Sequence, residues 1–116
     1  MAVEFEFFEN ELGNSDPADV YRSLDSELQV KFTDKKQIIE KYGFQQVLRS
    51  KFFEKIKGIK EDIYEIKIKW KNKTELRFLG CIRNNVFWIL HIFWKKSQRG
   101  INHQIKLAIE RSKLIK

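Results

Sequence analysis

Three stretches in the second half of the chain carry the hydrophobic patterns of β-strands. In residues 62–70 apolar side chains alternate with charged ones, which predicts a strand with one face on a core and the other toward water or an anion. Residues 75–83 continue this pattern, whereas residues 86–94 are apolar on both faces, as expected of a strand covered on both sides. The stretches are separated by residues 72–73 and 84–85, which contain asparagines that tolerate the positive φ of hairpin turns. The pattern predicts an antiparallel meander.

The residues before this meander predict a short strand and two helices. Residues 3–8 alternate as a strand. Asp16-Pro17 has the features of an N-cap followed by proline at the first helical position, and apolar residues then recur at helical spacing up to Gly43, which suits a C-cap. One helix or two can span residues 17–42, and a break near residues 23–26 favours two, which we expect to cover one face of the sheet.

The remaining segments complete the expected fold. Residues 44–51 have no clear period and predict a connector, and residues 53–57 predict a strand or an extended lead-in. Gly100 separates the third strand of the meander from a final helix. The inward face of that helix consists of Ile101, Ile105, Ala108, Ile109 and Ser112. We therefore expect a single α+β domain over residues 1–116, with an antiparallel sheet of four to five strands, two N-terminal helices and one C-terminal helix.

The charge of the chain restricts its partners. Its 116 residues suit one domain, and 23 Lys and Arg against 16 Asp and Glu give a net charge of +7. A basic surface favours nucleic acid, an acidic protein or anionic lipid, with ordinary solubility charge as the other explanation. The single Cys81 excludes an internal disulfide and fits a reducing compartment. Acidic residues interrupt the N-terminal apolar residues, and no apolar run approaches the roughly 20 residues that span a bilayer, so we expect a cytoplasmic protein without a membrane contact.

Few residues suit the common catalytic centres. We expect no metal site and no cofactor, because His91 and His103 belong to different elements and no cluster of Cys or carboxylates accompanies them. His91 alternates with the face of Phe87, Ile89 and Phe93, which favours a hydrogen-bonded structural histidine over a functional one. His103 lies in the first turn of the last helix, where a proton donor, a phosphate contact and a surface residue are all open. Cys81 has no evident base partner, and the five glycines form no phosphate-binding loop.

Lysines and arginines form the most informative group. Lys67 and Lys69 share one face of the first strand of the meander, and Arg77 lies on the next strand. We expect Lys67 and Arg77 to project from the face of the sheet opposite the two N-terminal helices. Lys95, Lys96 and Arg99 crowd the end of the third strand. A solvated polar face and a convergent anion site explain this pattern equally well. Trp70 and Trp94 could stack on a base, but their parity places them with the core face.

These segments also resemble a known family. The order and spacing of several motifs resemble the RelE/ParE superfamily of toxins from bacterial toxin–antitoxin pairs, and most closely its HigB-like, phage-derived branch. The resemblance covers nearly the whole chain, and no single motif carries it alone. The motifs are Glu4-Phe5-Glu6-Phe7-Phe8, Gly13-Asn14-Ser15, Tyr64-Glu65-Ile66-Lys67, Leu76-Arg77-Phe78, residues 89–98, and a helix with Ala108 and Arg111.

The resemblance implies metal-independent cleavage of RNA. By position, the resemblance implies that Lys67 is the base and that Arg77 stabilises the phosphate. It also implies that Lys95 with Lys96 neutralises charge or donates a proton. Contacts to RNA fall to Lys69, Gln98, Arg99 and His103. Two departures leave the acid and any stacking partner unassigned: Glu65 replaces the first lysine of a Lys-x-Lys motif, and residues 102–104 contain no tyrosine.

The expected function is a growth-inhibiting, ribosome-dependent mRNA endonuclease. Its expected partners are the ribosome, mRNA and a cognate antitoxin with a helix-turn-helix, HigA-like domain. One alternative is a non-enzymatic, ParE-type gyrase poison, and another is a decayed phage-derived protein that retains only partner binding. The basic strand face favours the endonuclease.

Overall fold

A five-stranded sheet with helices on both faces forms the protein. The computed structural model describes residues 2–95 and 100–115. The strands are β1 (Glu4–Phe7), β2 (Phe53–Lys55), β3 (Tyr64–Lys69), β4 (Glu75–Arg83) and β5 (Val86–Lys95). The helices are α1 (Asp16–Ser23), α2 (Ser26–Tyr42), α3 (Phe44–Val47) and α4 (Ile101–Ser112), and a 3₁₀ turn spans Lys71–Lys73. The expected α+β class is confirmed.

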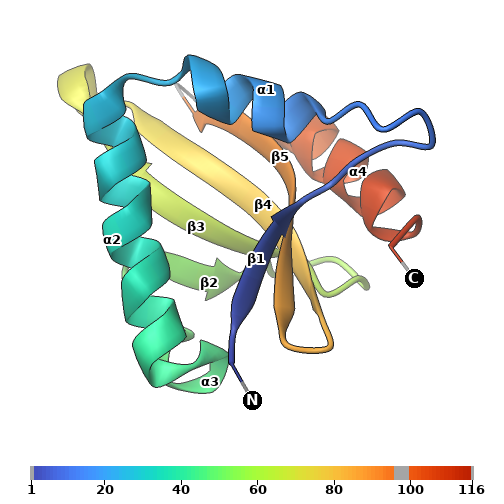
Figure 1. Cartoon of the computed structure of the whole chain (residues 1–116), viewed down its shortest axis with the longest axis horizontal. Helices are drawn as coiled ribbons and strands as arrows, with labels where there is room; N and C mark the ends of the chain where they lie inside the picture. The colour runs from blue at the N-terminus through green and yellow to red at the C-terminus, as the bar shows by residue number, and fades with distance from the viewer. Residues whose placement is uncertain (1, 96–99, 116) are drawn as a thin grey trace.

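The sheet is mixed rather than antiparallel. The strand order is β1-β5-β4-β3-β2, and β2 to β5 pair antiparallel, as the meander predicted. β1 pairs parallel with β5, from Glu4 opposite Val86 to Phe7 opposite Ile89 (Figure 1). The expectation of an antiparallel sheet is therefore wrong for this edge. Helices rather than a tight turn follow β1, so no hairpin dictates the direction of its neighbour.

The turns and helix ends follow local sequence signals closely. Asn72, Lys73, Asn84 and Asn85 all have positive φ, which confirms both predicted hairpin turns. The break between α1 and α2 and the end of α2 at Gly43 are also confirmed. The N-cap of α1 is Ser15 rather than Asp16, because the Ser15 hydroxyl accepts the hydrogen bond from the Ala18 amide.

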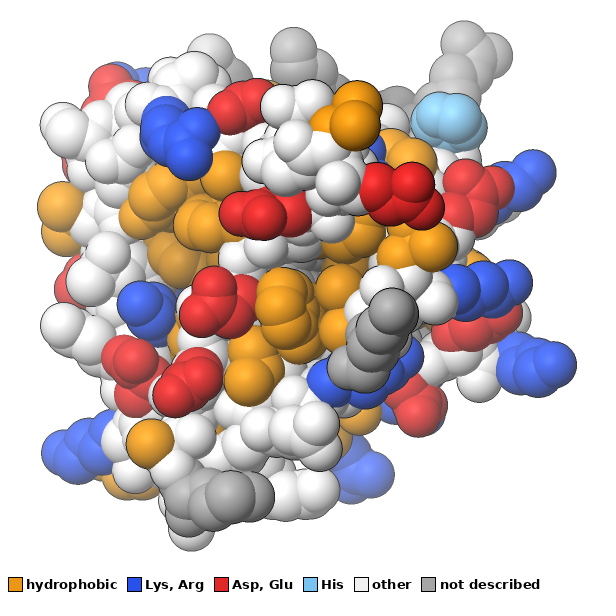
Figure 2. Space-filling view, turned by 45° about the vertical axis from the view of Figure 1, so that its right-hand side comes forward, with side chains coloured by type: hydrophobic (Ala, Val, Ile, Leu, Met, Phe, Trp, Pro, Cys, Tyr) orange, Lys and Arg blue, Asp and Glu red, His pale blue; other side chains and the backbone are white. Residues whose placement is uncertain are grey.

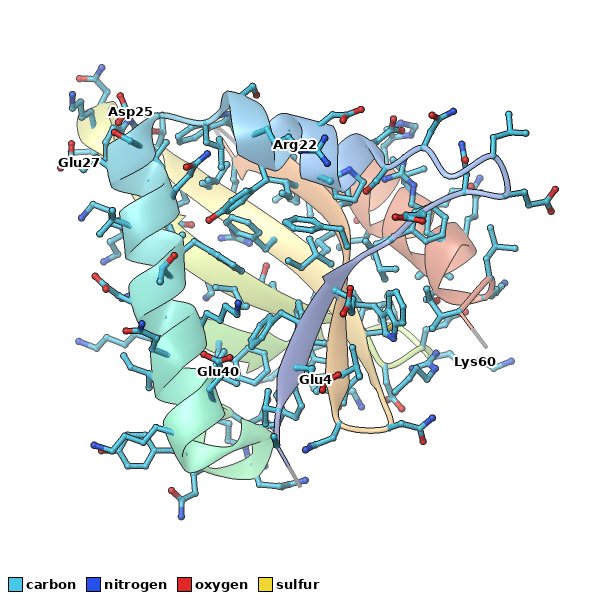
Figure 3. The ribbon with its side chains drawn as sticks, in the orientation of Figure 1. Glu4, Arg22, Asp25, Glu27, Glu40 and Lys60 are labelled. Atoms are coloured by element: carbon cyan, nitrogen blue, oxygen red, sulfur yellow. The ribbon has the colours of Figure 1, made fainter. Side chains whose placement is uncertain are left out.

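Two further details complete the helices. Asp25 caps α2 by accepting a hydrogen bond from the Glu27 amide, and both residues lie at the N-terminal end of this helix (Figure 3). α3 is a short helix in the segment for which a connector was predicted; its four residues are too few for a helical period to be evident.

One core fills the space between the sheet and helices α1 and α2. Phe32 of α2 stacks on Phe78 of β4, with ring centroids 4.3 Å apart, and Tyr21 of α1 packs on both rings. Ile66 and Ile68 of β3 reach this core, so their alternation with charged residues is confirmed. The two N-terminal helices thus cover one face of the sheet, as predicted.

A second core lies on the other face, beneath α4. Its buried residues are Phe8, Ile63, Leu79, Cys81, Leu90 and Ala108. Ile105 and Ile109 pack against it, and Ser112 is buried, which confirms the predicted inward face of the last helix. Because α4 covers only part of this face, the ends of β3, β4 and β5 that carry Lys67, Arg77 and Lys95 remain outside this core.

A shift of register in the middle of the sheet changes which face β5 presents. Leu79 lies opposite His91, but the next residue, Gly80, lies opposite Ile89, so Leu90 is an extra residue in β5. Leu90 lies in the core under α4, and the shift brings His91 and Phe93 to that side of the sheet as well. The guanidinium of Arg111 in α4 donates a hydrogen bond of 2.7 Å to the Leu90 carbonyl and another to Asp16.

The surface is uneven in charge. Figure 2 shows acidic side chains among apolar ones across one face, with most Lys and Arg near its margins. In the described part of the chain, no helix has the length and apolar character needed to cross a membrane.

Candidate functional site

Two cross-strand rows bring the predicted cations together on the sheet. Lys67 of β3 lies opposite Arg77 of β4, and Arg77 lies opposite Phe93 of β5. The next row contains Lys69, Glu75 and Lys95. The alternation of β3 and β4 directs these side chains away from the core beneath α2, since Ile66, Ile68, Leu76 and Phe78 occupy that core. The expected projection of Lys67 and Arg77 from the opposite face is confirmed.

Carboxylates hold Arg77 at both ends of its guanidinium. Nη1 lies 3.0 Å from Oε2 of Glu65, and Nη2 lies 2.7 Å from Oε1 of Glu75. Only 11 % of the Arg77 side chain is exposed, and its Nε is buried without a hydrogen-bond partner among the described residues. Arg77 is thus fixed in orientation, with its buried Nε–H donor unused.

Lys67 also lies between carboxylates. Its Nζ donates a 3.1 Å hydrogen bond to Oε1 of Glu54 in β2 and lies 3.9 Å from Oε1 of Glu65. Glu65 is itself buried, and its two oxygens face the two cations Lys67 and Arg77. The sequence showed that Glu65 shares the face of Lys67, but Glu54 enters the cluster only through the pairing of β2 with β3.

The described members of the cluster are therefore close to charge balance. The cations are Lys67, Lys69, Arg77 and Lys95, and the anions are Glu54, Glu65 and Glu75. The hydrogen bond from Arg77 lowers the pKa of the Glu75 carboxyl, and the nearby charge of Arg77, Lys95 and Lys67 acts in the same direction against partial burial. Glu75 is thus held ionised, and an incoming phosphate must compete with it for Nη2 of Arg77.

The two histidines have different surroundings. Nε2 of His91 is hydrogen-bonded to Oε1 of Gln104 in α4, which confirms a hydrogen-bonded histidine. Burial lowers the pKa of His91, against the effect of the Gln104 hydrogen bond. Its predicted face is wrong in part: His91 does lie with Phe93, on which it stacks, but the extra residue Leu90 places both on the side opposite Phe87 and Ile89. His103 is exposed in the first turn of α4.

Other predicted residues take different places. Lys96, Gln98 and Arg99 lie outside the described residues. Trp70 packs against the core, as its parity predicted. Trp94 does not, since it is 37 % exposed at the end of β5, and the prediction of a core position is wrong there. Burial raises the pKa of the Cys81 thiol, so Cys81 is poorly suited to act as a nucleophile.

A groove at the edge of the sheet contains residues that sequence reasoning missed. We call it the edge groove; its volume is about 340 Å³, and five lysines line it: Lys31, Lys35, Lys51, Lys67 and Lys69. Phe52, Asp34 and Glu75 also line it. The spacing of Lys31 and Lys35 places them one helical turn apart in α2, but the pattern alone could not show that this turn faces β3.

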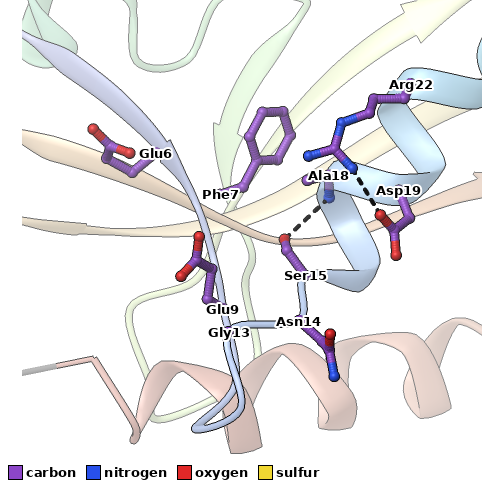
Figure 4. Close-up of a pocket in the computed structure, with 9 residues that line it drawn as sticks. All are labelled: Glu6, Phe7, Glu9, Gly13, Asn14, Ser15, Ala18, Asp19 and Arg22. Atoms are coloured by element: carbon purple, nitrogen blue, oxygen red, sulfur yellow. Dashed lines mark hydrogen bonds and ion pairs between the residues drawn. The ribbon is translucent and has the colours of Figure 1, made fainter.

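A second cavity has the opposite charge. It has a volume of about 240 Å³ and lies between β1 and the start of α1 (Figure 4). Glu6, Glu9 and Asp19 line it, and Arg22 is paired with Asp19 at 2.8 Å. These carboxylates make the cavity unsuitable for phosphate. Within residues 2–95 and 100–115, no group of three or more His, Cys, Asp or Glu is arranged to hold a metal ion.

Comparison with known proteins identifies the family. The sequence model described as Phage derived protein Gp49-like (DUF891) matches residues 19–113. The chain belongs to the Gp49-like family. This phage-derived family is RelE-like and toxin-like, which agrees with the broader part of the resemblance found in the sequence. Neither the search of curated proteins nor the search of solved structures returned a match.

Proposed function

We propose that this Gp49-like protein is a toxin that cleaves mRNA on the ribosome without a metal ion. The observation that carries the proposal is the pairing of Arg77 with Lys67 on two central strands, next to carboxylates and outside both cores. Family membership supports the proposed role as a toxin, and the geometry of Arg77 and Lys67 supports cleavage of RNA without a metal ion.

Cleavage of RNA without a metal requires three contributions. The 2′-hydroxyl must lose a proton, the charge of the phosphorane must be stabilised, and the 5′-oxygen must gain a proton. Arg77 suits the second task, because its planar guanidinium can stay on Glu65 through Nη1 while Nη2 donates to a phosphate oxygen. Lys95, which lies opposite Glu75 in the next cross-strand row, is the described residue of the implied basic pair and would serve for neutralisation or protonation.

Two side chains are candidates for the base. Lys67 holds the implied position, but it acts as a base only after it releases the proton that it donates to Glu54. Glu54 is the second candidate, because it is 43 % exposed and already accepts a hydrogen bond from Lys67. The variants Lys67→Ala and Glu54→Gln distinguish the two candidates when cleavage is measured against pH. The base determines the acidic limb of the pH–rate profile, so the variant that removes the base is the one that changes this limb.

The ion pairs regulate access to Arg77. Glu75 is 26 % exposed and Glu65 is 12 % exposed, so Glu75 is the carboxylate that an incoming phosphate can displace with less disturbance. Binding of RNA then exchanges one anion on Nη2 for another, and Glu65 continues to orient the guanidinium from the other side.

The partners follow from the same proposal. A basic toxin of this kind requires a less basic cognate antitoxin, with a helix-turn-helix, HigA-like domain as the expected form. Charge complementarity speeds the association of such partners, while apolar burial supplies most of the affinity. Purification of the protein alone in good yield, without a growth defect on strong induction, would count against a toxin that needs neutralisation.

The decisive experiment replaces Arg77. Wild type, Arg77→Lys and Arg77→Ala are induced in cells, and the 5′ ends of translated mRNAs are mapped. We expect both variants to lose toxicity and cleavage, because loss of one preorganised donor costs about 10²–10³ in rate, and lysine lacks the planar fork that holds Glu65 on one nitrogen and a phosphate on the other. Arg83→Lys on the same strand is the matched control, since the hydrogen bond that Arg83 makes within the described part of the chain goes to the carbonyl of its neighbour Ile82. Full activity of a folded Arg77→Lys protein would remove Arg77 from the site.

A second candidate is a non-enzymatic poison of DNA gyrase. The observation that favours it is the occupation of both Arg77 terminal nitrogens by carboxylates, as in a purely structural cluster. Toxicity with DNA damage and without mRNA cleavage, unchanged in Arg77→Lys, would select this candidate.

A further inference from the structure

The edge groove forms where the sheet loses its outer strand. β2 pairs with β3 only from Tyr64 to Ile66, and the Lys67 amide donates to the Phe52 carbonyl just beyond it. Among the described residues, no strand pairs with Ile68 and Lys69 on that side. Lys31 and Lys35 of α2 line the space left there, so the groove extends from the sheet edge to the helix.

The charge of the groove differs from that of the Arg77 cluster. Arg77 and Lys67 are bound by carboxylates, whereas Lys31, Lys35, Lys51 and Lys69 make no ion pair with any described residue. Among the described residues that line the groove, Asp34 is the single acid outside the Arg77 cluster. The groove therefore carries uncompensated positive charge, which favours an anionic ligand.

An aromatic ring adds a second recognition element. Phe52 lines the groove, and Nζ of Lys35 lies 4.8 Å from the centre of its ring. Rings beside lysines are the usual means of binding single-stranded nucleic acid, because a base stacks on the ring while cations contact the backbone. A glutamate-rich peptide would use the lysines but would gain little from the ring.

The groove also joins the proposed catalytic face. Lys67 and Glu75 belong both to the groove and to the Arg77 cluster. A strand whose phosphate lies on Arg77 can thus continue past Lys69 into the groove. A volume of about 340 Å³ lies at the lower end of ligand pockets, which is enough for one nucleotide.

We propose that the edge groove binds one nucleotide of single-stranded RNA next to the scissile phosphate, with the base on Phe52 and the phosphate among Lys31, Lys35 and Lys69. This inference rests on the proposed function and adds a binding site to it. In the bound state the base takes the place of the Lys35 ammonium over the ring, and Lys35 turns to the phosphate.

The test measures binding separately from cleavage. A fluorescein-labelled, 2′-O-methyl oligouridine, which cannot be cut, is titrated by anisotropy at several salt concentrations. The double variant Lys31→Ala/Lys35→Ala should reduce the slope of log K against log salt by up to about 0.7, since the single phosphate bound in the groove contributes roughly 0.7 for a single strand. Phe52→Leu should weaken binding at least about fivefold with an unchanged slope. The control Lys41→Ala/Lys113→Ala removes the same charge from residues that do not line the groove and should bind as wild type does.

The outcomes separate the groove from the catalytic proposal. The proposed RNA site in the edge groove is wrong if the groove variants bind the oligouridine like the control. It is also wrong if the wild type has no affinity for the oligouridine. A glutamate-rich peptide that binds through Lys31 and Lys35 while the RNA does not also overturns it, in favour of a protein partner. Groove-dependent RNA binding by a wild type that cuts no translated mRNA supports the groove and rejects the endonuclease.

Discussion

Arg77 and Glu65 form an ion pair of 3.0 Å on adjacent strands, and both side chains are almost nine-tenths buried. Such a pair has two distinct effects. It orients the guanidinium for any anion that reaches Nη2, and it leaves a buried carboxylate without its closest partner when Arg77 is removed. Loss of function and loss of stability must therefore be measured separately at this position.

The first prediction concerns the stability of this pair. Arg77→Ala should lower the free energy of unfolding by about 3 kcal/mol at pH 7, because Glu65 then stays buried with only Lys67 at 3.9 Å. The double variant Arg77→Leu/Glu65→Leu should recover most of this loss, since apolar side chains need no partner. Urea denaturation measures both. Equal stability of wild type and Arg77→Ala would show that the pair is not buried in solution.

The second prediction concerns Glu75. Because its folded pKa is lowered, its ion pair stabilises the fold above the ordinary pKa of a glutamate and is lost as pH falls through the lowered value. Glu75→Gln should thus reduce stability slightly at pH 7, by less than about 1 kcal/mol, with the difference vanishing in acid. The same variant should bind RNA more tightly, since Nη2 of Arg77 becomes available. Weaker RNA binding by Glu75→Gln would contradict the displacement of this carboxylate by phosphate.

The third prediction uses the lowered pKa of His91. The folded state binds a proton at His91 less readily than the unfolded state, so the free energy of unfolding should fall as pH drops below about 6.5. His91→Gln should reduce this dependence between pH 7 and pH 5. Urea midpoints of the two proteins across this range provide the measurement, and identical pH profiles would contradict the burial of His91.

Residue alternation predicted much of this fold. It placed Ile66, Phe78 and Lys67 on the correct faces, because period-two patterns record burial directly. It could not give the direction of β1, which depends on a strand about eighty residues away. It also could not reveal the extra residue at Leu90. Because this residue reverses the alternation of β5 beyond it, His91 lies on the face opposite Phe87 and Ile89.

The candidate site was predicted only in part. The cations on β3 and β4 were identifiable from the sequence, because residues two positions apart in a strand lie on the same face. Their partners were not all identifiable: Glu54 reaches Lys67 through strand pairing. Lys31 and Lys35 join the edge groove through the packing of α2 on the sheet, which no local pattern specifies.

The fourth prediction concerns Arg111, which joins three elements. It donates 2.7 and 2.8 Å hydrogen bonds to the Leu90 carbonyl and to Asp16, and it lies over the ring of Phe8. Arg111→Ala should lower the free energy of unfolding by about 2 kcal/mol, because a carbonyl in the interior then loses a charged donor. Arg22→Ala is the control: its ion pair with Asp19 is exposed, so we expect a change below about 1 kcal/mol. Equal effects of the two variants would mean that Arg111 does not clamp α4 onto the sheet.

The last prediction concerns Gly80, the residue at the register shift. A Cβ built there lies 2.3 Å from Cε1 of Phe87 and 2.5 Å from the carbonyl oxygen of Trp88. Phe87 is fully buried and packed against other rings, and the carbonyl belongs to the backbone of β5, so neither can move without opening the sheet. Gly80→Ala should therefore destabilise the protein by roughly 1–3 kcal/mol or more, although alanine is otherwise better suited to a strand than glycine. The buried thiol of Cys81 reports the same event, since opening β4 from β5 should accelerate its reaction with a thiol reagent in the native buffer. A Gly80→Ala protein with wild-type stability and an unreactive Cys81 would show that β5 has room for the methyl group, and the close approach of β4 to β5 at the bulge would then be wrong.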